Sequence, residues 1–524
     1  MTLFFAYSFL VSKYKNNDYN EYIRLVINMF VGSQQQLKNY DAYLLAHGYT
    51  IEQLIDYASD CLLPHFKDYH NVAIMVGPGN NGADGLSLAL KLSQDHVKVT
   101  IFYIGDLDRF SPGNQHYFQM CEDANLEMIL VDDDVITMLS ERINDYDVIA
   151  DSFFGFGLNS APRGMYKTVI DTINTYYLNE IIAIDIPTGL DCNSGKPYAS
   201  VLFASQTICL SALKQGFLNP ESRMVTGIVK VEELAIDNPF MEAGLYEIYE
   251  QMQASKELKD RKFDGYKQSY GVDLIIAGSK QYRGAPILCA KGAAYSGAGI
   301  VKLMSDESVI ERLPEILPEL IGLNRLEHLS KEDFMGYQAI TIGPGLSLAA
   351  SSKQLVADVL KNSTAPLVID ADALTILSEH LEYLENQDRT IVLTPHLGEY
   401  KRLCHEDTIE DPMMSIQSFA KKYHVIVVLK GPYTMVSDGV NSYRIASGNP
   451  AMAVGGMGDT LTGMITAMLG QGYEPVTAVR LAVFIHGMAG DLVARNAYTV
   501  MPEKLSENIP SAMYILNNQL QDKR

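Results

Sequence analysis

The feature that most constrains this chain is a series of short, continuous apolar runs separated by longer amphipathic segments. In the first half of the chain these runs are residues 72–77, 99–105, 148–151, 181–185 and 207–212. Each run is apolar almost throughout, which is typical of a strand that is buried on both faces. Amphipathic helices between such strands indicate a mostly parallel sheet covered by helices on both sides.

A second series of the same kind follows in the second half, at residues 274–278, 299–304, 339–343, 367–370, 391–394 and 425–430. Residues 241–268, between the two series, are charged and carry no strand signal, so we predict a linker over 241–264. The sequence therefore predicts an α/β protein with two domains, residues 29–240 and 265–524.

The first residues of the chain carry a different pattern. The apolar run 2–11 is too short to span a bilayer, and no basic segment precedes it. We expect residues 1–28 to be a non-native or disordered extension, with Met29 able to open the chain.

Charge and cysteine content narrow the classes of ligand. The net charge of −22 argues against non-specific nucleic-acid binding, which needs clustered Lys and Arg. A nucleotide is compatible with this charge, because helix N-termini, a few basic side chains or a metal ion can bind phosphate. The six cysteines include no CxxC pair, which is typical of free thiols in a reducing cytosol. We expect a cytoplasmic protein with small-molecule substrates and neither a nucleic-acid nor a membrane partner.

The densest chemical signal is the glycine-rich stretch GNPAMAVGGMGDTLTG at residues 448–463. Apolar residues recur at helical spacing after it, so the glycines form a turn that opens a helix, with Asp459 in the first turn. Free backbone N–H groups and the helix dipole make such a turn a site for a phosphoryl group. A carboxylate there can deprotonate a hydroxyl held beside the anion. The structural alternative is a plain glycine turn with an acidic first-turn residue.

Three loops that contain glycines and acids follow strand ends in the first half. They read VGPGNNGADG (76–85), DSFFGFGLNSAPRG (151–164) and DIPTGLDCNSG (185–195), and we predict a helix after Asp84. Ligands of open α/β sheets bind outside the carboxyl ends of the strands, so these loops should converge. The alternative for Asp151 and for the Asp at 185 is local loop capping.

These loops resemble the signature loops of the NAD(P)HX epimerase family, the YjeF N-terminal domain, over roughly residues 34–240. The resemblance implies a Rossmann-like three-layer αβα sandwich, with Asp185 as the catalytic acid/base. It also implies a potassium ion held by Asn81, Asp151 and Thr188. The resemblance further implies that Asp185 and two loops bind the hydrated nucleotide. The first loop is Asn80, Asn81, Gly82, Ala83 and Asp84, and the second is Gly155, Phe156, Gly157, Leu158, Asn159, Ser160 and Ala161.

Two positions in this half, Ala83 and Lys214, bear on how closely the chain follows the family pattern. Ala83 stands where the family usually has a second Gly, which bears on how closely the backbone approaches the ligand. Lys214 falls where the family carries a Lys near the site. A solvated strand-end Lys is an equally weighted alternative.

Several turns precede the 448–463 stretch in the second half of the chain. Among them are GAP (284–286), GPG (343–345), TPHLGE (394–399) and LKGPYT (429–434). Together they resemble the NAD(P)HX dehydratase family of the ribokinase-like superfamily, over roughly residues 265–520, and imply a ribokinase-like αβα sandwich. The resemblance assigns hydrate contacts to Ala285, Gly345, His396 and Asp459, with Asp459 as the base. It assigns nucleotide binding to Lys430, Gly431, Pro432, Tyr433, Thr434 and Gly458. The alternatives are a structural or surface role for His396 and a strand-end charge for Lys430.

The two resemblances together imply repair of hydrated NADH and NADPH. The first domain would interconvert R and S NADHX or NADPHX, and the second would dehydrate the S form while ADP is cleaved to AMP and phosphate, with Mg²⁺ on the nucleotide. A homo-oligomer is also expected. The alternative is a small-molecule kinase for a vitamin precursor, joined to a non-catalytic N-terminal nucleotide-binding module.

Overall fold

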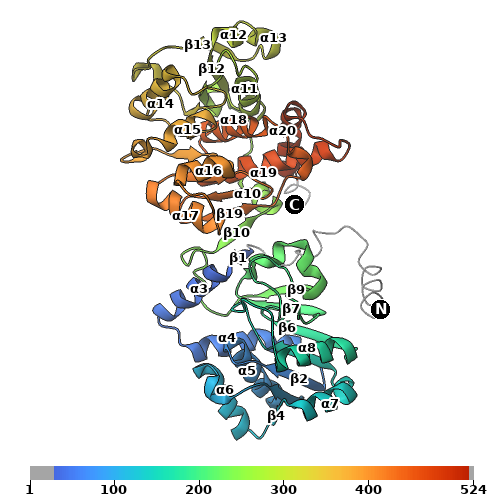
Figure 1. The fold of residues 1–524 in the computed structure, drawn as a ribbon. Coiled ribbons are helices and arrows are strands. Elements are labelled where there is room, and N and C mark those ends of the chain that lie inside the picture. The colour runs from blue at the N-terminus through green and yellow to red at the C-terminus, as the bar shows by residue number, and fades with distance from the viewer. Residues whose placement is uncertain (1–28, 519–524) are drawn as a thin grey trace. The chain divides into compact units, whose positions relative to one another are not determined.

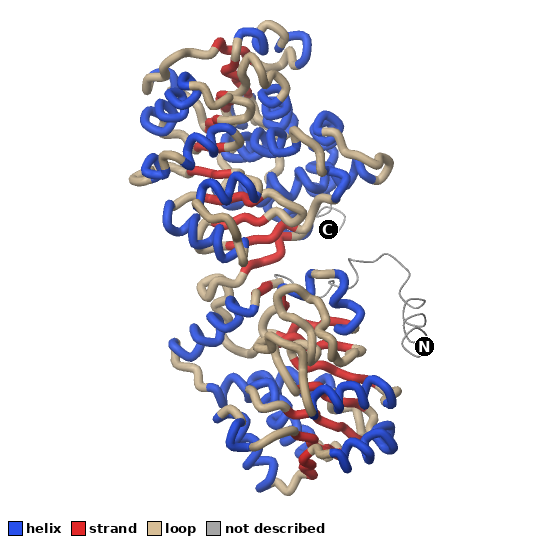
Figure 2. Tube along the Cα trace, viewed as in Figure 1, coloured by secondary structure: helices blue, strands red, loops and turns tan. Residues whose placement is uncertain are grey.

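The computed structural model describes residues 29–518, so the prediction for residues 1–28 lies outside the described residues. The chain divides into two compact units between Leu245 and Tyr246, here called unit 1 and unit 2. Each unit has a mostly parallel sheet with helices on both faces (Figures 1 and 2). The predicted α/β class with two αβα sandwiches is confirmed.

Unit 1 has a main sheet in the order β4-β3-β2-β5-β6-β7-β9, in which all pairs are parallel, and a short parallel pair, β1 with β8. Its strands are β1 (Phe30–Gly32), β2 (Asn71–Val76), β3 (Lys98–Tyr103), β4 (Glu127–Leu130), β5 (Val148–Ser152), β6 (Glu180–Ile184), β7 (Gln206–Leu210), β8 (Leu213–Lys214) and β9 (Ile228–Glu232). Its helices are α3 (Gln34–Ala46), α4 (Ile51–Leu62), α5 (Asn80–Gln94), α6 (Pro112–Asp123), α7 (Asp133–Arg142), α8 (Met165–Tyr176) and α9 (Arg223–Thr226).

The core of unit 1 has two halves, one on each face of this sheet. On β2, Val72, Ile74 and Val76 belong to the cluster formed with α4, α5 and α6. The alternate residues Ala73 and Met75 belong to the cluster formed with α7 and α8. Successive strand residues point to opposite faces, so a continuous apolar run satisfies both layers.

Unit 2 has the strand order β13-β12-β11-β14-β15-β16-β17-β18-β19-β10, which is parallel except for the antiparallel pairs that β18 makes with β17 and β19. Its strands are β10 (Tyr246–Tyr249), β11 (Val272–Ile276), β12 (Ile300–Ser305), β13 (Ile321–Asn324), β14 (Ala339–Ile342), β15 (Leu367–Ile369), β16 (Ile391–Leu393), β17 (Ile426–Leu429), β18 (Met435–Ser437) and β19 (Ser442–Ile445). Its helices are α10 (Gln251–Glu257), α11 (Ala285–Tyr295), α12 (Glu307–Ile310), α13 (Leu313–Ile316), α14 (Ala350–Asn362), α15 (Asp372–Ser378), α16 (Leu397–Cys404), α17 (Pro412–Tyr423), α18 (Met457–Gly470), α19 (Pro475–Ala494) and α20 (Pro502–Asn518).

Helices α11 and α18 cross at direct backbone contact. A Cβ on Gly463 would lie 1.8 Å from the Cys289 carbonyl oxygen, and one on Gly292 would lie 2.2 Å from the Thr460 oxygen. Only glycine permits such an approach. The position of α18 is therefore fixed by a contact that admits no side chain.

Helix α19 is long and apolar enough to cross a membrane, but 67% of its apolar window is buried inside the structure. It packs on α18 and α20. Its composition is thus that of a core helix of unit 2.

The segment predicted as a linker, residues 241–264, is largely folded. Tyr246–Tyr249 form β10, which pairs in parallel with β19, and Gln251–Glu257 form α10, which packs on α19 and α20. Residues 246–257 therefore belong to unit 2, whereas the sequence analysis placed its start at 265. Their sequence is short and rich in charged residues, so the strand within it was not predicted, although three of its four residues are buried.

Candidate functional sites

The three predicted loops of unit 1 converge at the carboxyl edge of the sheet, because β2, β5 and β6 are neighbours. Asp151, at the end of β5, accepts hydrogen bonds from the backbone N–H and the hydroxyl of Thr188, each at 2.7 Å. Asn81 lies beside Gly155, where an added Cβ would be 3.3 Å from the Asn81 Cβ. The strand order reverses between β2 and β5, which is the usual ligand position in such sheets.

The segment 80–84 is the start of a helix, which corrects the prediction of a loop with a helix after Asp84. Helix α5 begins at Asn80 with Gly79 as its N-cap, so the ligand loop ends earlier. Within the described residues the backbone N–H groups of Asn80 and Asn81 have no hydrogen-bond partner, so they can bind an anion. A Cβ on Gly82 would lie 2.1 Å from the Gly77 oxygen, whereas Ala83 packs its methyl into the core.

Asp151 is wholly buried and has no ion-pair partner among residues 29–518. Burial raises its pKa to about 6, although the Thr188 hydrogen bonds oppose the shift. The Nδ2 of Asn81 is also buried without a partner in the described part of the chain. An uncompensated carboxylate beside a hydroxyl oxygen fits a weakly held, hard monovalent cation such as potassium, whereas the Nδ2 of Asn81 is a hydrogen-bond donor and not a cation ligand.

Asp185 follows β6 in the left-handed region, at φ 69°, where non-glycine residues are uncommon. Its Oδ1 accepts a hydrogen bond from the backbone N–H of Leu210 at 3.2 Å and forms a salt bridge with Lys214. Lys214 is 1% exposed, so the alternative of a solvated strand-end Lys is wrong. Burial lowers the pKa of Lys214, but the interactions with its buried neighbours, above all Asp185, together outweigh burial and raise the pKa.

The predicted loop 155–161 is a true loop between β5 and α8, and its residues are partly or fully exposed. The Phe156 carbonyl accepts a hydrogen bond from Gln34 Nε2 at 2.8 Å. The backbone N–H of Gln34 donates to Asn193 Oδ1 at 2.7 Å. The start of α3 therefore holds two of the three loops together.

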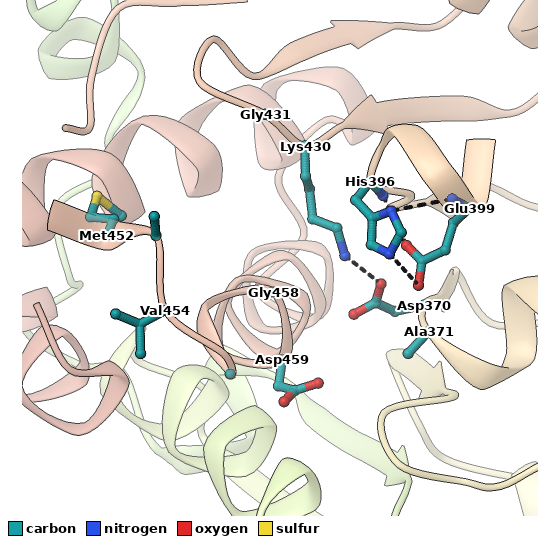
Figure 3. A pocket seen from close by; sticks show the side chains of 12 residues that line it. Asp370, Ala371, His396, Glu399, Lys430, Gly431, Met452, Val454, Gly458 and Asp459 are labelled. Atoms are coloured by element: carbon teal, nitrogen blue, oxygen red, sulfur yellow. Dashed lines mark hydrogen bonds and ion pairs between the residues drawn. The ribbon is translucent and has the colours of Figure 1, made fainter. Parts of the chain in front are cut away.

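In unit 2 a cavity of about 540 Å³ opens at the carboxyl ends of β15, β16 and β17 (Figure 3). The predicted residues His396, Lys430, Gly431, Gly458 and Asp459 all line it. The lining residues are Asp370, Ala371, His396, Glu399, Lys430, Gly431, Met452, Ala453, Val454, Gly456, Gly458 and Asp459.

The glycine-rich stretch opens α18 as predicted. Its N-cap, Gly456, has φ 95°, and Asp459 lies in the first turn. Burial raises the pKa of Asp459 to about 7, with a further rise from the charge of Asp370 that Lys430 partly opposes. A carboxyl group with this pKa can act as a base near neutral pH.

Lys430, directly after β17, is a half-buried, paired charge rather than a free strand-end charge. Its Nζ donates to Asp370 Oδ1 at 2.7 Å, and Thr462 donates to Asp370 Oδ2 at 2.7 Å. Asp370 was not among the predicted site residues, although it ends a predicted strand, as Asp151 and Asp185 do. Burial would raise the pKa of Asp370, but the charge of Lys430 and the hydrogen bonds that the carboxylate accepts together outweigh burial and lower the pKa.

His396 is the N-cap of α16, so part of its role is structural. Its Nδ1 accepts hydrogen bonds from the N–H groups of Gly398 at 3.0 Å and Glu399 at 3.2 Å. An accepting Nδ1 carries no proton, which places the ring proton on Nε2. The ring also lines the cavity, where an Nε2–H donor can meet a substrate oxygen.

The remaining predicted residues of unit 2 are not among those that line this cavity. Ala285 and Gly345 lie together, since a Cβ on Gly345 would be 3.1 Å from that of Ala285. Pro432, Tyr433 and Thr434 continue the loop after Lys430, with the Arg444 guanidinium 3.7 Å from the centre of the Tyr433 ring. These residues remain predictions as ligand contacts.

Two family profiles match the chain, one for each unit. That of the YjeF-related protein N-terminus matches residues 50–216, and that of NAD(P)H-hydrate dehydratase matches residues 273–511. A solved structure of ADP/ATP-dependent NAD(P)H-hydrate dehydratase from Bacillus subtilis shares 29% identity over 51% of this chain and 98% of that chain, with a TM-score of 0.46.

Curated relatives match both units at once. The bifunctional NAD(P)H-hydrate repair enzyme Nnr of Thermofilum pendens is 32% identical over 444 residues, which are 81% of this chain and 83% of that protein. The protein of the same name from Vibrio cholerae is 32% identical over 430 residues, covering 81% of this chain and 84% of that protein. The chain belongs to the family of bifunctional NAD(P)H-hydrate repair enzymes.

Proposed function

We propose that unit 1 interconverts the R and S forms of NAD(P)HX and that unit 2 dehydrates the S form to NAD(P)H with ADP as the phosphoryl donor. The observation that carries this proposal is the single cavity that joins Asp459, with its pKa of about 7, to the glycine turn and Lys430. A base, a set of free N–H groups and a fixed cation are what transfer of a phosphoryl group to a hydroxyl requires.

The dehydration has two steps in unit 2. Asp459 takes the proton of the C6 hydroxyl as its oxygen attacks the terminal phosphorus, and the bond to the nucleotide's bridging oxygen breaks. The backbone N–H groups at the start of α18 and the Lys430 ammonium stabilise the charge on the phosphoryl oxygens. The C6–O bond then breaks, phosphate leaves with the electron pair and takes the C5 proton, and the C5–C6 double bond is restored.

Mg²⁺ would neutralise part of the phosphate charge when it enters with the nucleotide. No cluster of three or more His, Cys, Asp or Glu side chains able to hold a metal ion occurs within residues 29–518. The metal would therefore be held largely by the phosphates. The choice of ADP follows from the likeness of this two-unit chain to fused bacterial members.

In unit 1 we assign proton transfer to Asp185, with Lys214 holding its carboxylate in place. Potassium would be held by Asn81, Asp151 and Thr188, where it would compensate the buried charge of Asp151. The first turn of α5 and the loop 155–161 would bind the hydrated nucleotide. These assignments are supported by the convergence of the three loops at one sheet edge.

We also propose a cytoplasmic location and a homo-oligomeric state. All six cysteines are free thiols, which suits a reducing compartment. The oligomeric state remains a prediction that size-exclusion chromatography with light scattering can test.

The decisive experiment mixes the purified protein with epimeric NADHX, Mg²⁺ and either ADP or ATP, and follows NADH by its fluorescence. Chromatographic separation of the two epimers reports epimerisation without nucleotide. The proposal predicts both reactions, with ADP the better donor. A stable phosphorylated alcohol formed in place of NADH would instead support the vitamin-precursor kinase. Failure to interconvert the epimers would support a non-catalytic unit 1.

A further inference from the structure

Asp370 joins three elements of unit 2 at a single buried carboxylate. It follows β15 and is 1% exposed. One oxygen accepts a hydrogen bond from Lys430, which follows β17, and the other from Thr462, in α18. Thr462 lies three residues after Asp459, so the second bond is made within one turn of the proposed base.

The backbone around Asp370 is held in an unfavourable conformation. Ala371, which lines the cavity, has φ 50° and ψ −121°, a combination that non-glycine residues rarely adopt. The backbone of Gly343 also packs directly against Asp370, since a Cβ on Gly343 would lie 1.9 Å from the Asp370 carbonyl oxygen. Strained backbone that the surrounding structure enforces is concentrated at functional sites.

The Lys430 ammonium lies against the start of α18. Its Nζ is 3.0 Å from where a Cβ on Gly458 would stand, one residue before Asp459. A lysine ammonium has three N–H donors, and Asp370 accepts the one hydrogen bond that Nζ makes within residues 29–518. The others can reach phosphoryl oxygens in the cavity that Lys430 lines.

We propose that Asp370 is a positioning residue for the phosphoryl transfer: it holds the Lys430 ammonium at the glycine turn and ties the first turns of α18 to β15 through Thr462. The inference rests on the proposed function of unit 2 and adds a residue that acts through another. Lys430 alone, on a flexible four-carbon stem, would sample several positions, and binding nucleotide would require that freedom to be lost.

Three variants of the full chain test this role. Asp370→Asn keeps the shape and removes the charge, Lys430→Met removes the ammonium, and the double variant combines them. With NADHX and ADP, we expect Asp370→Asn to lower kcat/KM by roughly 100-fold, the loss typical of a displaced reacting group. Because Asp370 acts on the ammonium through Lys430, the two losses should not multiply. The double variant should be worse than Lys430→Met by no more than Thr462→Val is worse than the wild type.

The pH dependence provides a readout that a merely structural role would not move. Removing the negative charge of Asp370 lowers the pKa of Asp459, because that charge raises it more than Lys430 lowers it. The acid-side midpoint of kcat should therefore move to lower pH in Asp370→Asn, by roughly one unit. Thr462→Val, which removes one hydrogen bond and keeps the charge, should lower kcat/KM but leave this midpoint in place.

A matched control is Asp273→Asn in β11, an equally buried carboxyl of the same sheet that lies against Gly470 at the far end of α18. It should leave kcat/KM and the midpoint unchanged. Circular dichroism melting identifies any variant that fails to fold, in which case Thr462→Val provides the test. Asp370→Asn with kcat/KM within twofold of the wild type, or losses that multiply in the double variant, would overturn the proposal.

Calorimetric titration with Mg·ADP separates this inference from the proposed function. A wild type that forms no NADH refutes the function. The role of Asp370 is then decided by binding alone. Equal weakening in Asp370→Asn and Lys430→Met supports it, and unchanged affinity in Asp370→Asn overturns it.

Discussion

Replacing Asp273 by Val should stabilise unit 2, and more so at neutral than at acid pH. Asp273 is wholly buried in β11, and neither carboxylate oxygen has a hydrogen-bond partner within residues 29–518. A Cβ on Gly470 would lie 2.0 Å from its Oδ1, so α18 packs directly onto the carboxyl group. Val is close to Asp in volume, has no polar atom and favours strands.

The magnitude has two parts. Removing a buried polar group that lacks a partner is worth about 1–3 kcal/mol at any pH. Burial also raises the pKa of Asp273 well above its usual value, so the folded carboxyl keeps a proton that the unfolded chain has released. Raising the pH from the unfolded pKa toward the folded one therefore destabilises the wild type, by about 1.4 kcal/mol per pH unit within that window.

Differential scanning calorimetry of the full chain at pH 5 and pH 7 measures both parts. Each kcal/mol should raise Tm by roughly 2–4 °C for a unit of this size. Asp273→Asn should show only the pH-dependent part of the stabilisation, because its side-chain amide is still buried without a hydrogen-bond partner. An increase in the Tm of Asp273→Val that is equal at both pH values, or a Tm below that of the wild type, would refute the reasoning.

Four further predictions concern the two sites. Asp459→Asn should lower NADH formation from NADHX by at least about 100-fold and leave epimerisation intact; near-normal turnover would exclude Asp459 as the base. In the wild type, the pKa of about 7 predicts a dehydration rate that falls roughly tenfold per pH unit on the acid side of that value, and a flat profile from pH 5 to 7 would contradict it. Thr188→Val, which removes one oxygen beside Asp151, should raise the potassium concentration needed for half-maximal epimerisation while dehydration is unchanged; equal potassium dependence in variant and wild type would rule out the site. Lys214→Met leaves the Asp185 charge buried and unpaired, so unit 1 should lose about 3–5 kcal/mol of stability along with epimerisation, and an unchanged melting temperature would count against that pairing.

The strands inside the parallel part of each sheet were predictable because burial on both faces makes them continuous apolar runs. The interior strands β18 and β19, which read MVS and SYRI, form no such run and were not predicted. Edge strands are half exposed and give no such run, and the sequence analysis did not identify β4, β9 or β13. Each of these three lies at an edge of its sheet. The apolar-run criterion therefore finds the centre of a parallel sheet and misses its borders.

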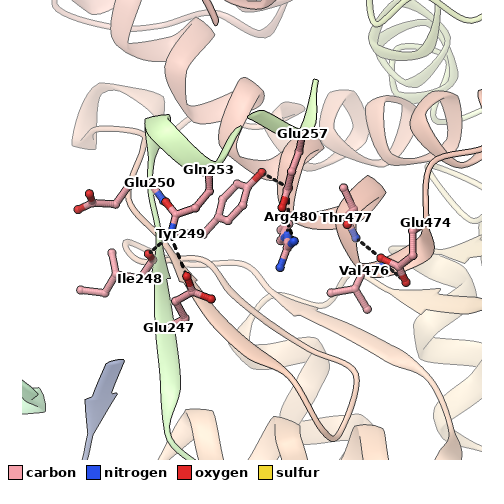
Figure 4. A network of polar contacts seen from close by, with 10 residues as sticks. All are labelled: Glu247, Ile248, Tyr249, Glu250, Gln253, Glu257, Glu474, Val476, Thr477 and Arg480. Carbon is pink, nitrogen blue, oxygen red and sulfur yellow. Dashed lines mark hydrogen bonds and ion pairs between the residues drawn. The ribbon is translucent and has the colours of Figure 1, made fainter. Parts of the chain in front are cut away.

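The prediction of a linker was wrong for residues 246–257, because their charge content was taken as a sign of a solvated segment. Charged residues there make specific contacts: Glu257 accepts hydrogen bonds from Tyr249 at 2.6 Å and from Arg480 of α19 at 3.2 Å, and Gln253 donates to Glu247 at 2.8 Å (Figure 4). Charge content alone does not distinguish a solvated segment from one whose charges are paired with a distant helix.

Site residues on one local motif were predictable, and those defined by distant contacts were not. Asp459 and its glycine turn form a contiguous pattern. Asp370 ends a predicted strand, but its proposed role depends on contacts with Lys430, 60 residues away, and Thr462, 92 residues away, which no local spacing reveals. Lys214 shows the same limit, because only its pairing with Asp185 distinguishes a buried cation from a solvated one.

The glycine contact between α11 and α18 limits which amino-acid changes this chain can accept over generations. A methyl group at Gly292 or Gly463 would push α18 away from α11, and Asp459, at the start of that helix, would move with it. Neither glycine lines the cavity. A genetic screen for loss of dehydration should therefore recover inactive alleles at this helix crossing as well as at the proposed base, although the encoded changes lie outside the cavity.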